Sequence, residues 1–145
     1  MTSKRALAID IGLQRTGLAV SSELGLPIKL LPNLVSNSQK MAVSTLLEKI
    51  GELEVKTVVI GIPEERTVQS KTIASRARSL KNALDEALAS HNMVVKVILF
   101  DESHTSRRAS LSLVASGVRK KERKTKLDSA SAAILLEDFL ASQGD

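Results

Sequence analysis

Short apolar runs recur along the chain, and their bounds predict five strands. Residues 6–12 and 18–20 are separated by a polar loop with a glycine at each end, a pattern typical of a β-hairpin. Three more strands are expected, within residues 26–35 and at residues 55–62 and 94–100. Pro27 and Pro32 interrupt the first of these three, which favours an edge position in the sheet.

Apolar residues at helical spacing lie between and after these runs and predict four helices. The helices are expected after the capping residues 36–38 up to Gly51, over residues 68–90, from Thr105 or Ser106 to about Gly117, and over residues 127–142. Helices between strands imply parallel pairing, and the opening hairpin is antiparallel. We therefore expect one α/β domain over residues 1–145, with a mixed five-stranded sheet.

One acid stands inside the first apolar run. An ionised carboxylate in an apolar strand is costly unless it is paired or binds a cation, so Asp10 is either a local turn acid or a functional one. Strand alternation puts Asp10 on the same face as Ala6 and Ala8, whose small side chains leave room for another group.

Further acids end the last strand and open the last helix. Alternation sends Asp101 and Glu102 to opposite faces, so one of the two can join Asp10, and Glu102 is our choice. The spacing around Asp128 predicts that it is a helix N-cap residue. The carboxyl ends of parallel strands are the usual ligand sites of such sheets, so these acids could converge there on a metal ion.

Positive charge is concentrated near the C-terminus. The net charge is +5, and eight of the 21 lysines and arginines lie within residues 107–126. Residues 119–126 are expected to form a loop that steers phosphate toward Asp128, although such a run is often only a solvated segment. The candidate nucleic-acid-binding residues are Arg15, Arg119, Lys120, Lys121, Arg123, Lys124 and Lys126.

Composition narrows the range of functions. There is no cysteine, no apolar run long enough to cross a bilayer and no signal-peptide pattern, so we expect a cytoplasmic protein without membrane contact. With two Phe and no Tyr or Trp, the chain has little on which to stack bases. A nucleic-acid partner would therefore be bound through phosphates and helical shape.

Four motifs together resemble those of one family. Residues 10–20 (DIGLQRTGLAV) are similar to the opening DxGxxRxGxAV of the YqgF/RuvX family of Holliday-junction-resolvase-like nucleases. Residues 59–63 (VIGIP) resemble its strand ending in VGLP, and residues 101–106 (DESHTS) its DERLTS segment. Residues 120–136 resemble its basic loop followed by a DxxAAxxIL helix. The resemblance covers nearly the whole chain.

The resemblance implies an RNase H-like three-layer fold with helices on both faces of the sheet, and a metal-dependent nuclease. It implies processing of the 5′ end of the small-subunit ribosomal RNA precursor, or resolution of branched DNA. The catalytic acids would be Asp10, Glu102 (or its neighbour Asp101) and Asp128, with Asp10, Glu102 and Asp128 binding Mg²⁺ or Mn²⁺. We expect at most a weak homodimer.

Two departures from the family pattern support a different function. Ser103 stands where the family has an arginine, and the loop after Pro63 has no glycine. Both favour an RNase H-like scaffold that binds nucleic acid without cutting it. A kinase of the actin type also opens on a DxG hairpin, but it needs a second similar domain for which this chain is too short.

Overall fold

The computed structural model describes residues 5–36, 38–101 and 120–143, with residues 120–129 described as backbone only. Its strands are β1 (Ala6–Ile11), β2 (Thr16–Ser22), β3 (Gly25–Leu34), β4 (Thr57–Ile62) and β5 (Lys96–Asp101). Its helices are α1 (Gln39–Glu52), α2 (Val68–Ser90) and α4 (Lys120–Gln143). The third expected helix, over residues 105–117, lies outside the described ranges.

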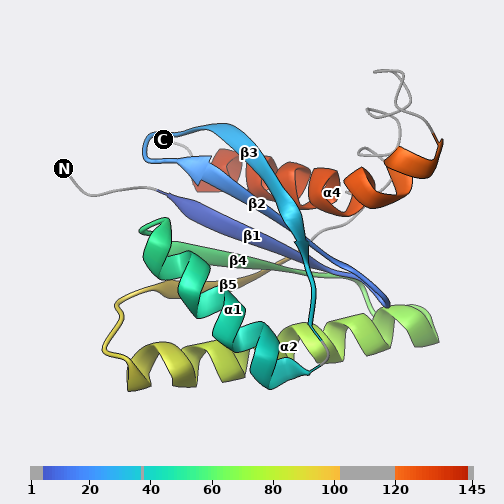
Figure 1. Ribbon diagram of the computed structural model, residues 1–145. Coiled ribbons are helices and arrows are strands. Elements are labelled where there is room, and N and C mark those ends of the chain that lie inside the picture. The colour runs from blue at the N-terminus through green and yellow to red at the C-terminus, as the bar shows by residue number, and fades with distance from the viewer. Residues whose placement is uncertain (1–4, 37, 102–119, 144–145) are drawn as a thin grey trace.

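The five strands form one mixed sheet in the order β3-β2-β1-β4-β5. β1 pairs antiparallel with β2, and β2 with β3, whereas β1, β4 and β5 are parallel. Helices α1 and α2 cover one face and α4 covers the other, which gives three layers (Figure 1). The expected mixed α/β sheet with helices on both faces is confirmed.

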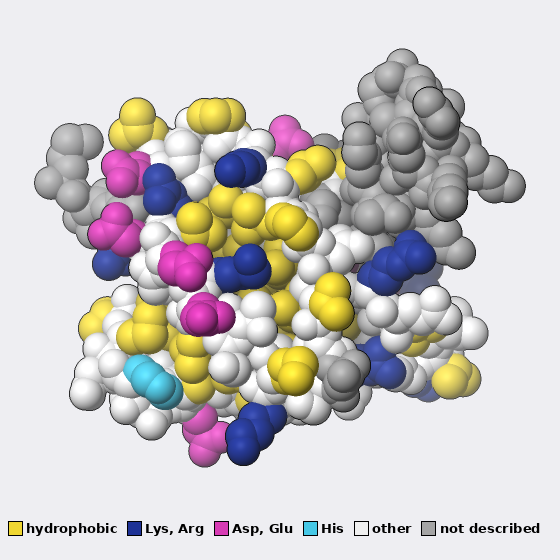
Figure 2. All heavy atoms as spheres, viewed as in Figure 1, with side chains coloured by type: hydrophobic (Ala, Val, Ile, Leu, Met, Phe, Trp, Pro, Cys, Tyr) yellow, Lys and Arg dark blue, Asp and Glu magenta, His cyan; other side chains and the backbone are white. Residues whose placement is uncertain are grey.

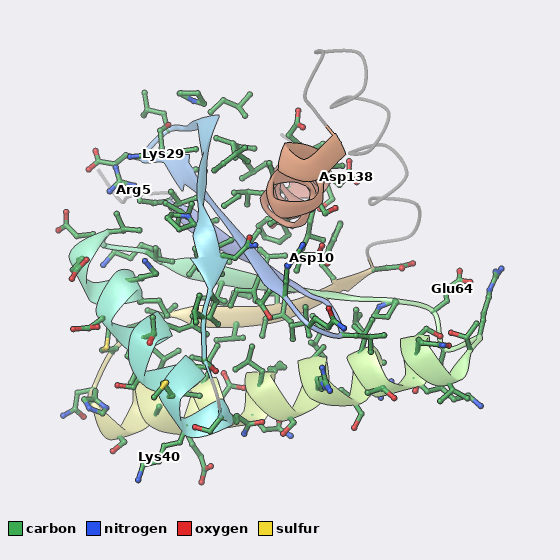
Figure 3. All side chains as sticks on the ribbon, turned by 45° about the vertical axis from the view of Figure 1, so that its right-hand side comes forward. Arg5, Asp10, Lys29, Lys40, Glu64 and Asp138 are labelled. Atoms are coloured by element: carbon green, nitrogen blue, oxygen red, sulfur yellow. The ribbon has the colours of Figure 1, made fainter. Side chains whose placement is uncertain are left out.

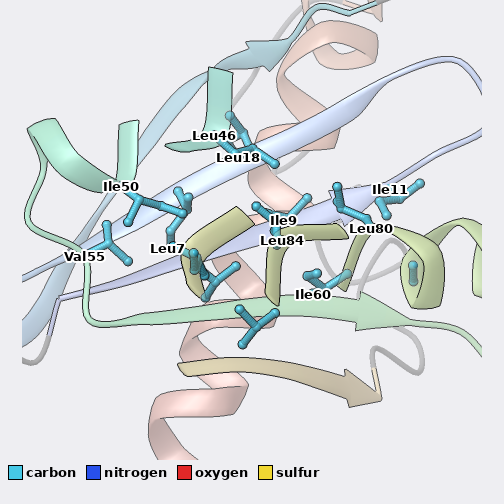
Figure 4. Close-up of a cluster of buried hydrophobic side chains, with 14 of the residues drawn as sticks. Leu7, Ile9, Ile11, Leu18, Leu46, Ile50, Val55, Ile60, Leu80 and Leu84 are labelled. Atoms are coloured by element: carbon cyan, nitrogen blue, oxygen red, sulfur yellow. The ribbon is translucent and has the colours of Figure 1, made fainter. Parts of the chain in front are cut away.

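Strand alternation divides the core into two parts. Leu7, Ile9 and Ile11 pack under α1 and α2, together with Leu46 and Leu84 (Figure 4). The alanines of β1 face the other way, where the apolar side of α4 covers them. Residues contributed by α4 include Ala132, Leu135, Leu136 and Phe139. Small residues on this face of β1 let α4 lie close to the sheet.

The edge strand β3 is the most exposed part of the sheet. Leu26 and Leu30 are 65% and 44% exposed, and apolar side chains gather over β3 and α1 on the face drawn in Figure 2. Proline interrupts ladder hydrogen bonding, so Pro27 and Pro32 fit an edge strand as the sequence predicts. None of the helices in the described ranges combines the length and the apolar character that a membrane crossing requires.

Candidate active site

Asp10 is the fifth residue of the six in β1 and lies close to the strand's carboxyl end. Its face is that of Ala6 and Ala8, both buried against α4, as alternation predicts. Figure 3 shows Asp10 on the side of the sheet that carries α4. The side chain is half-buried, so a carboxylate lies where apolar groups meet solvent.

Glycine flanks Asp10 on both neighbouring strands. Gly17 of β2 is its direct partner, and Gly61 of β4 follows Ile60, which pairs with Ile9. Cross-strand neighbours point to the same face of a sheet. Because both neighbours are glycines, they place no side chain beside the Asp10 carboxylate. One strand further across the sheet, Gly61 is paired with Phe100 of β5. The residues beside Asp10 on the two neighbouring strands therefore contribute no side chain next to its carboxylate.

The acid that ends β5 points away from Asp10. Ile98 and Phe100 pack in the α4-side core, while Val97 and Leu99 pack in the opposite one. Asp101 continues the series of Val97 and Leu99, so its side chain leaves the sheet on the α2 side. Asp101 and Asp10 therefore lie on opposite faces. Glu102 lies outside the described ranges.

Helix α4 begins earlier than the sequence spacing suggests. It starts at Lys120, so the prediction that residues 119–126 form a loop is wrong for residues 120–126; Arg119 lies outside the described ranges. Lysine, arginine and glutamate are good helix formers, and no glycine or proline interrupts residues 120–143. Asp128 is the ninth residue of α4. Its interpretation as a helix N-cap is therefore wrong as well.

The loop after Asp10 is tightly closed. The Gly12 N–H donates to the Arg15 carbonyl at 2.7 Å. A Cβ at Gly12 would approach the same oxygen to 2.7 Å, so only glycine fits without a shift of the backbone. Arg15 is half-buried in this loop.

An arginine from α2 holds the same loop. Arg76 Nη1 donates to the Leu13 carbonyl at 2.9 Å and lies 3.4 Å from the Gly12 carbonyl. Sequence reasoning missed Arg76, which is separated from the loop by more than 60 residues. Its only sequence signal is its place beside the buried Ala77, at the edge of the apolar stripe of α2.

The two acids after Pro63 are paired within their own region. Glu64 forms an ion pair with Arg66, and Glu65 forms one with Arg78 at 2.8 Å. The hydrogen bond and the charge of Arg78 lower the pKa of the Glu65 carboxyl. Across the ranges that the structure describes, no three acidic or histidine side chains come together in a group able to hold a metal ion.

Comparison with known proteins identifies the family. The model of the family "RuvX: Holliday junction resolvase" matches residues 4–142. A protein of Koribacter versatilis named "Putative pre-16S rRNA nuclease" is 30% identical over 140 residues, which cover 97% of this chain and 88% of that protein. A protein of Flavobacterium johnsoniae with the same name is 31% identical over 141 residues, covering 96% and 97%.

Solved structures confirm the RNase H-like fold. The chain is similar to Thermus thermophilus RuvC in complex with a Holliday junction substrate, with a TM-score of 0.56 at 20% identity. That match covers 97% of this chain and 96% of the other. Fowlpox virus resolvase with Holliday junction DNA gives 0.58 at 14% identity, covering 97% and 99%. The fold is shared with these resolvases, and the family model matches residues 4–142 of the chain. The chain therefore belongs to the RuvX family.

Proposed function

We propose that this protein is a metal-dependent endonuclease that cuts phosphodiester bonds in structured nucleic acid. The substrate we infer is the 5′ end of the 16S rRNA precursor. Relatives that align over nearly the whole chain are named for a pre-16S rRNA nuclease activity. The net charge of +5 favours a polyanionic partner.

The observation that carries the proposal is the position of Asp10 between Gly17 and Gly61. Neither glycine carries a side chain that would exclude a cation from this half-buried carboxylate, and a carboxylate that only fixes a turn needs no such neighbours. Asp101 lies on the face of the sheet opposite Asp10, and strand alternation in the sequence therefore favours Glu102 over Asp101.

Asp128 is the third acid of the proposed site. It precedes Ala132 by four residues and Leu135 by seven, the spacing of one helical row. Ala132 and Leu135 are buried against the sheet on the face of Asp10. We therefore infer that Asp10, Glu102 and Asp128 form the catalytic site.

Oxygen ligands suit Mg²⁺ or Mn²⁺, and Asp10 offers two carboxylate oxygens. Such a metal would supply charge stabilisation of the phosphate and activation of a water molecule. The role of the three acids is to bind and orient it. Without a cation, clustered carboxylates would repel one another, which is the physical reason to expect one.

Asp10→Asn tests this site. We expect loss of Mg²⁺-dependent cleavage of a pre-16S rRNA fragment by at least about a hundredfold, because even groups that only support a metal ligand cost 10- to 100-fold when removed. Nucleic-acid affinity measured in chelator, and stability to urea, should not fall. Equal cleavage by wild type and variant would indicate a contaminating nuclease and contradict the proposal.

Asp101→Asn is the matched control. It makes the same substitution at the carboxyl end of another parallel strand, β5, but on the other face of the sheet, so cleavage should persist. If Asp101→Asn abolished cleavage while Asp10→Asn did not, the assignment of the site to the α4 face would be wrong.

Two other functions make different predictions in the same assays. The pairing of Glu64 and Glu65 with arginines, and Ser103 where the family has arginine, favour a scaffold that binds without cutting. Binding without cleavage in both Mg²⁺ and Mn²⁺ would favour it. The resolvase folds bound to Holliday junctions favour a branched DNA substrate, so a four-way DNA junction should be assayed beside the RNA.

A further inference from the structure

A hollow of about 640 Å³ opens at the carboxyl end of β1, on the side opposite Asp10. It lies between the β1–β2 loop, the end of β3, the start of α1 and the middle of α2, segments that also converge in Figure 1. Its volume falls within the range of small-molecule and cofactor sites. Asp10 is not among the residues that line this hollow.

The walls of the hollow have a definite chemistry. Ile11, Ala42 and Leu80 supply apolar surface, and Arg15 and Arg76 supply positive charge. Among the described residues that line it there is no Asp or Glu. A site with two guanidinium groups, an apolar wall and no carboxylate favours an anion attached to an organic group.

Arg76 can hold the loop and a ligand at once. Both of its contacts to the loop, with the carbonyls of Gly12 and Leu13, use Nη1. A guanidinium carries five N–H donors in a planar fork, so the same side chain can also bind phosphate oxygens. A phosphate bound there would touch the loop that follows Asp10.

We propose that this hollow is a second phosphate-binding subsite, in which Arg76 and Arg15 hold a phosphodiester group of the nucleic-acid strand that continues past Asp10. The inference rests on the proposed nucleic-acid substrate but not on its cleavage. The hollow and Asp10 lie on opposite faces of the sheet at the carboxyl end of β1. A nucleic-acid strand can therefore run from the hollow, around the β1–β2 loop, to Asp10.

Gln39→Glu tests the subsite without touching the loop. Gln39 lines the hollow at the start of α1, and its Oε1 accepts a hydrogen bond from Ser79 at 2.8 Å, which a carboxylate can keep. A new negative charge there should repel phosphate and weaken binding of a fluorescein-labelled pre-16S rRNA fragment in EDTA by about tenfold at low salt.

Gln69→Glu is the matched control, since Gln69 is exposed in the first turn of α2 and neither helix has an acid in its first turn. It makes the same charge change outside the hollow and should alter affinity by less than about twofold. Equal weakening by both variants would reflect long-range charge alone and would overturn the proposal.

Arg76→Gln with Arg78→Gln is a second pair. Arg78 lies two residues further along α2. It forms an ion pair with Glu65 and does not line the hollow. Because Arg76 would neutralise one phosphate, its replacement should lower the slope of log affinity against log salt by about 1, and Arg78→Gln should leave the slope unchanged. Equal slopes for Arg76→Gln and wild type would overturn the subsite.

Free nucleotide is the other source of such a phosphate. Adenosine 5′-monophosphate added to labelled protein should shift the amide resonances of Gly12 and Arg15 only weakly. Strong shifts with unchanged RNA affinity in Gln39→Glu would assign the hollow to a mononucleotide and overturn our proposal. Since all binding is measured in EDTA, a failure of the nuclease assay leaves this test intact.

Discussion

At the scale of single residues, Gly12 shows how closely the loop after Asp10 is constrained. The Arg15 carbonyl lies 2.7 Å from the place a Cβ would take. We predict that Gly12→Ala destabilises the protein by about 1–3 kcal/mol, because backbone atoms must move to accept the methyl group. Urea unfolding followed by circular dichroism measures this change.

The control for Gly12→Ala is Gly51→Ala. Gly51 lies in the last turn of α1, and nothing stands within 4 Å of a Cβ there. Alanine should raise stability by about 0.4–1 kcal/mol, because it is the better helix former and restricts the unfolded chain. Destabilisation by Gly51→Ala, or none by Gly12→Ala, would contradict the steric account.

Single residues also show what the sequence can reveal of the site. The face of Asp10 follows from alternation, since two-residue periodicity needs only the chain itself. The flanking position of Gly61 and the contact of Arg76 with Leu13 depend on which strands and helices become neighbours. Such information arises only when the sheet order is known, so these partners could not be predicted from local pattern.

At the scale of elements, α2 begins with a capping box. Thr67 Oγ1 accepts from the Ser70 N–H at 3.0 Å, and Ser70 Oγ accepts from the Thr67 N–H at 2.8 Å. Thr67→Ala should cost about 0.5–2 kcal/mol in urea unfolding, because replacing an N-cap by alanine leaves a helix-end N–H without its partner.

Thr72→Ala makes the same substitution inside the helix. Thr72 Oγ1 donates to the Val68 carbonyl, four residues back, and alanine is the better helix former. The variant should be neutral or more stable than wild type. If Thr67→Ala and Thr72→Ala changed stability alike, the cap would not be the cause of the loss.

The elements also show where sequence patterns mislead. The expected caps at Ser38 and the expected helix over residues 68–90 are confirmed, since both rest on local hydrogen bonding and on periodic burial. The start of α4 was missed because its first turns carry charge instead of an apolar stripe. Helix propensity, which does not require burial, is the signal that favours a helix there.

At the scale of the whole molecule, the position of the positive charge decides how nucleic acid approaches. In Figure 1 the first turns of α4 and the carboxyl end of β1 lie toward the same side of the molecule. Lys56 and Lys96 lie at the amino ends of the parallel strands, and Lys29 pairs with Val20, which pairs with Leu7 near the amino end of β1. Two sets of lysines therefore lie at opposite ends of the sheet.

This separation gives a matched test of the basic segment. Replacing Lys120, Lys121 and Lys124 together by Gln should lower the slope of log affinity against log salt by about 2–3, because each phosphate that a lysine neutralises adds about 0.7–0.9 to that slope. Replacing Lys29, Lys56 and Lys96 by Gln removes equal charge from the far end of the sheet and should leave the slope nearly unchanged. RNA binding titrated at several salt concentrations in EDTA measures both. Equal slopes for the two triple variants would mean that net charge alone attracts the nucleic acid and that α4 has no part in holding it.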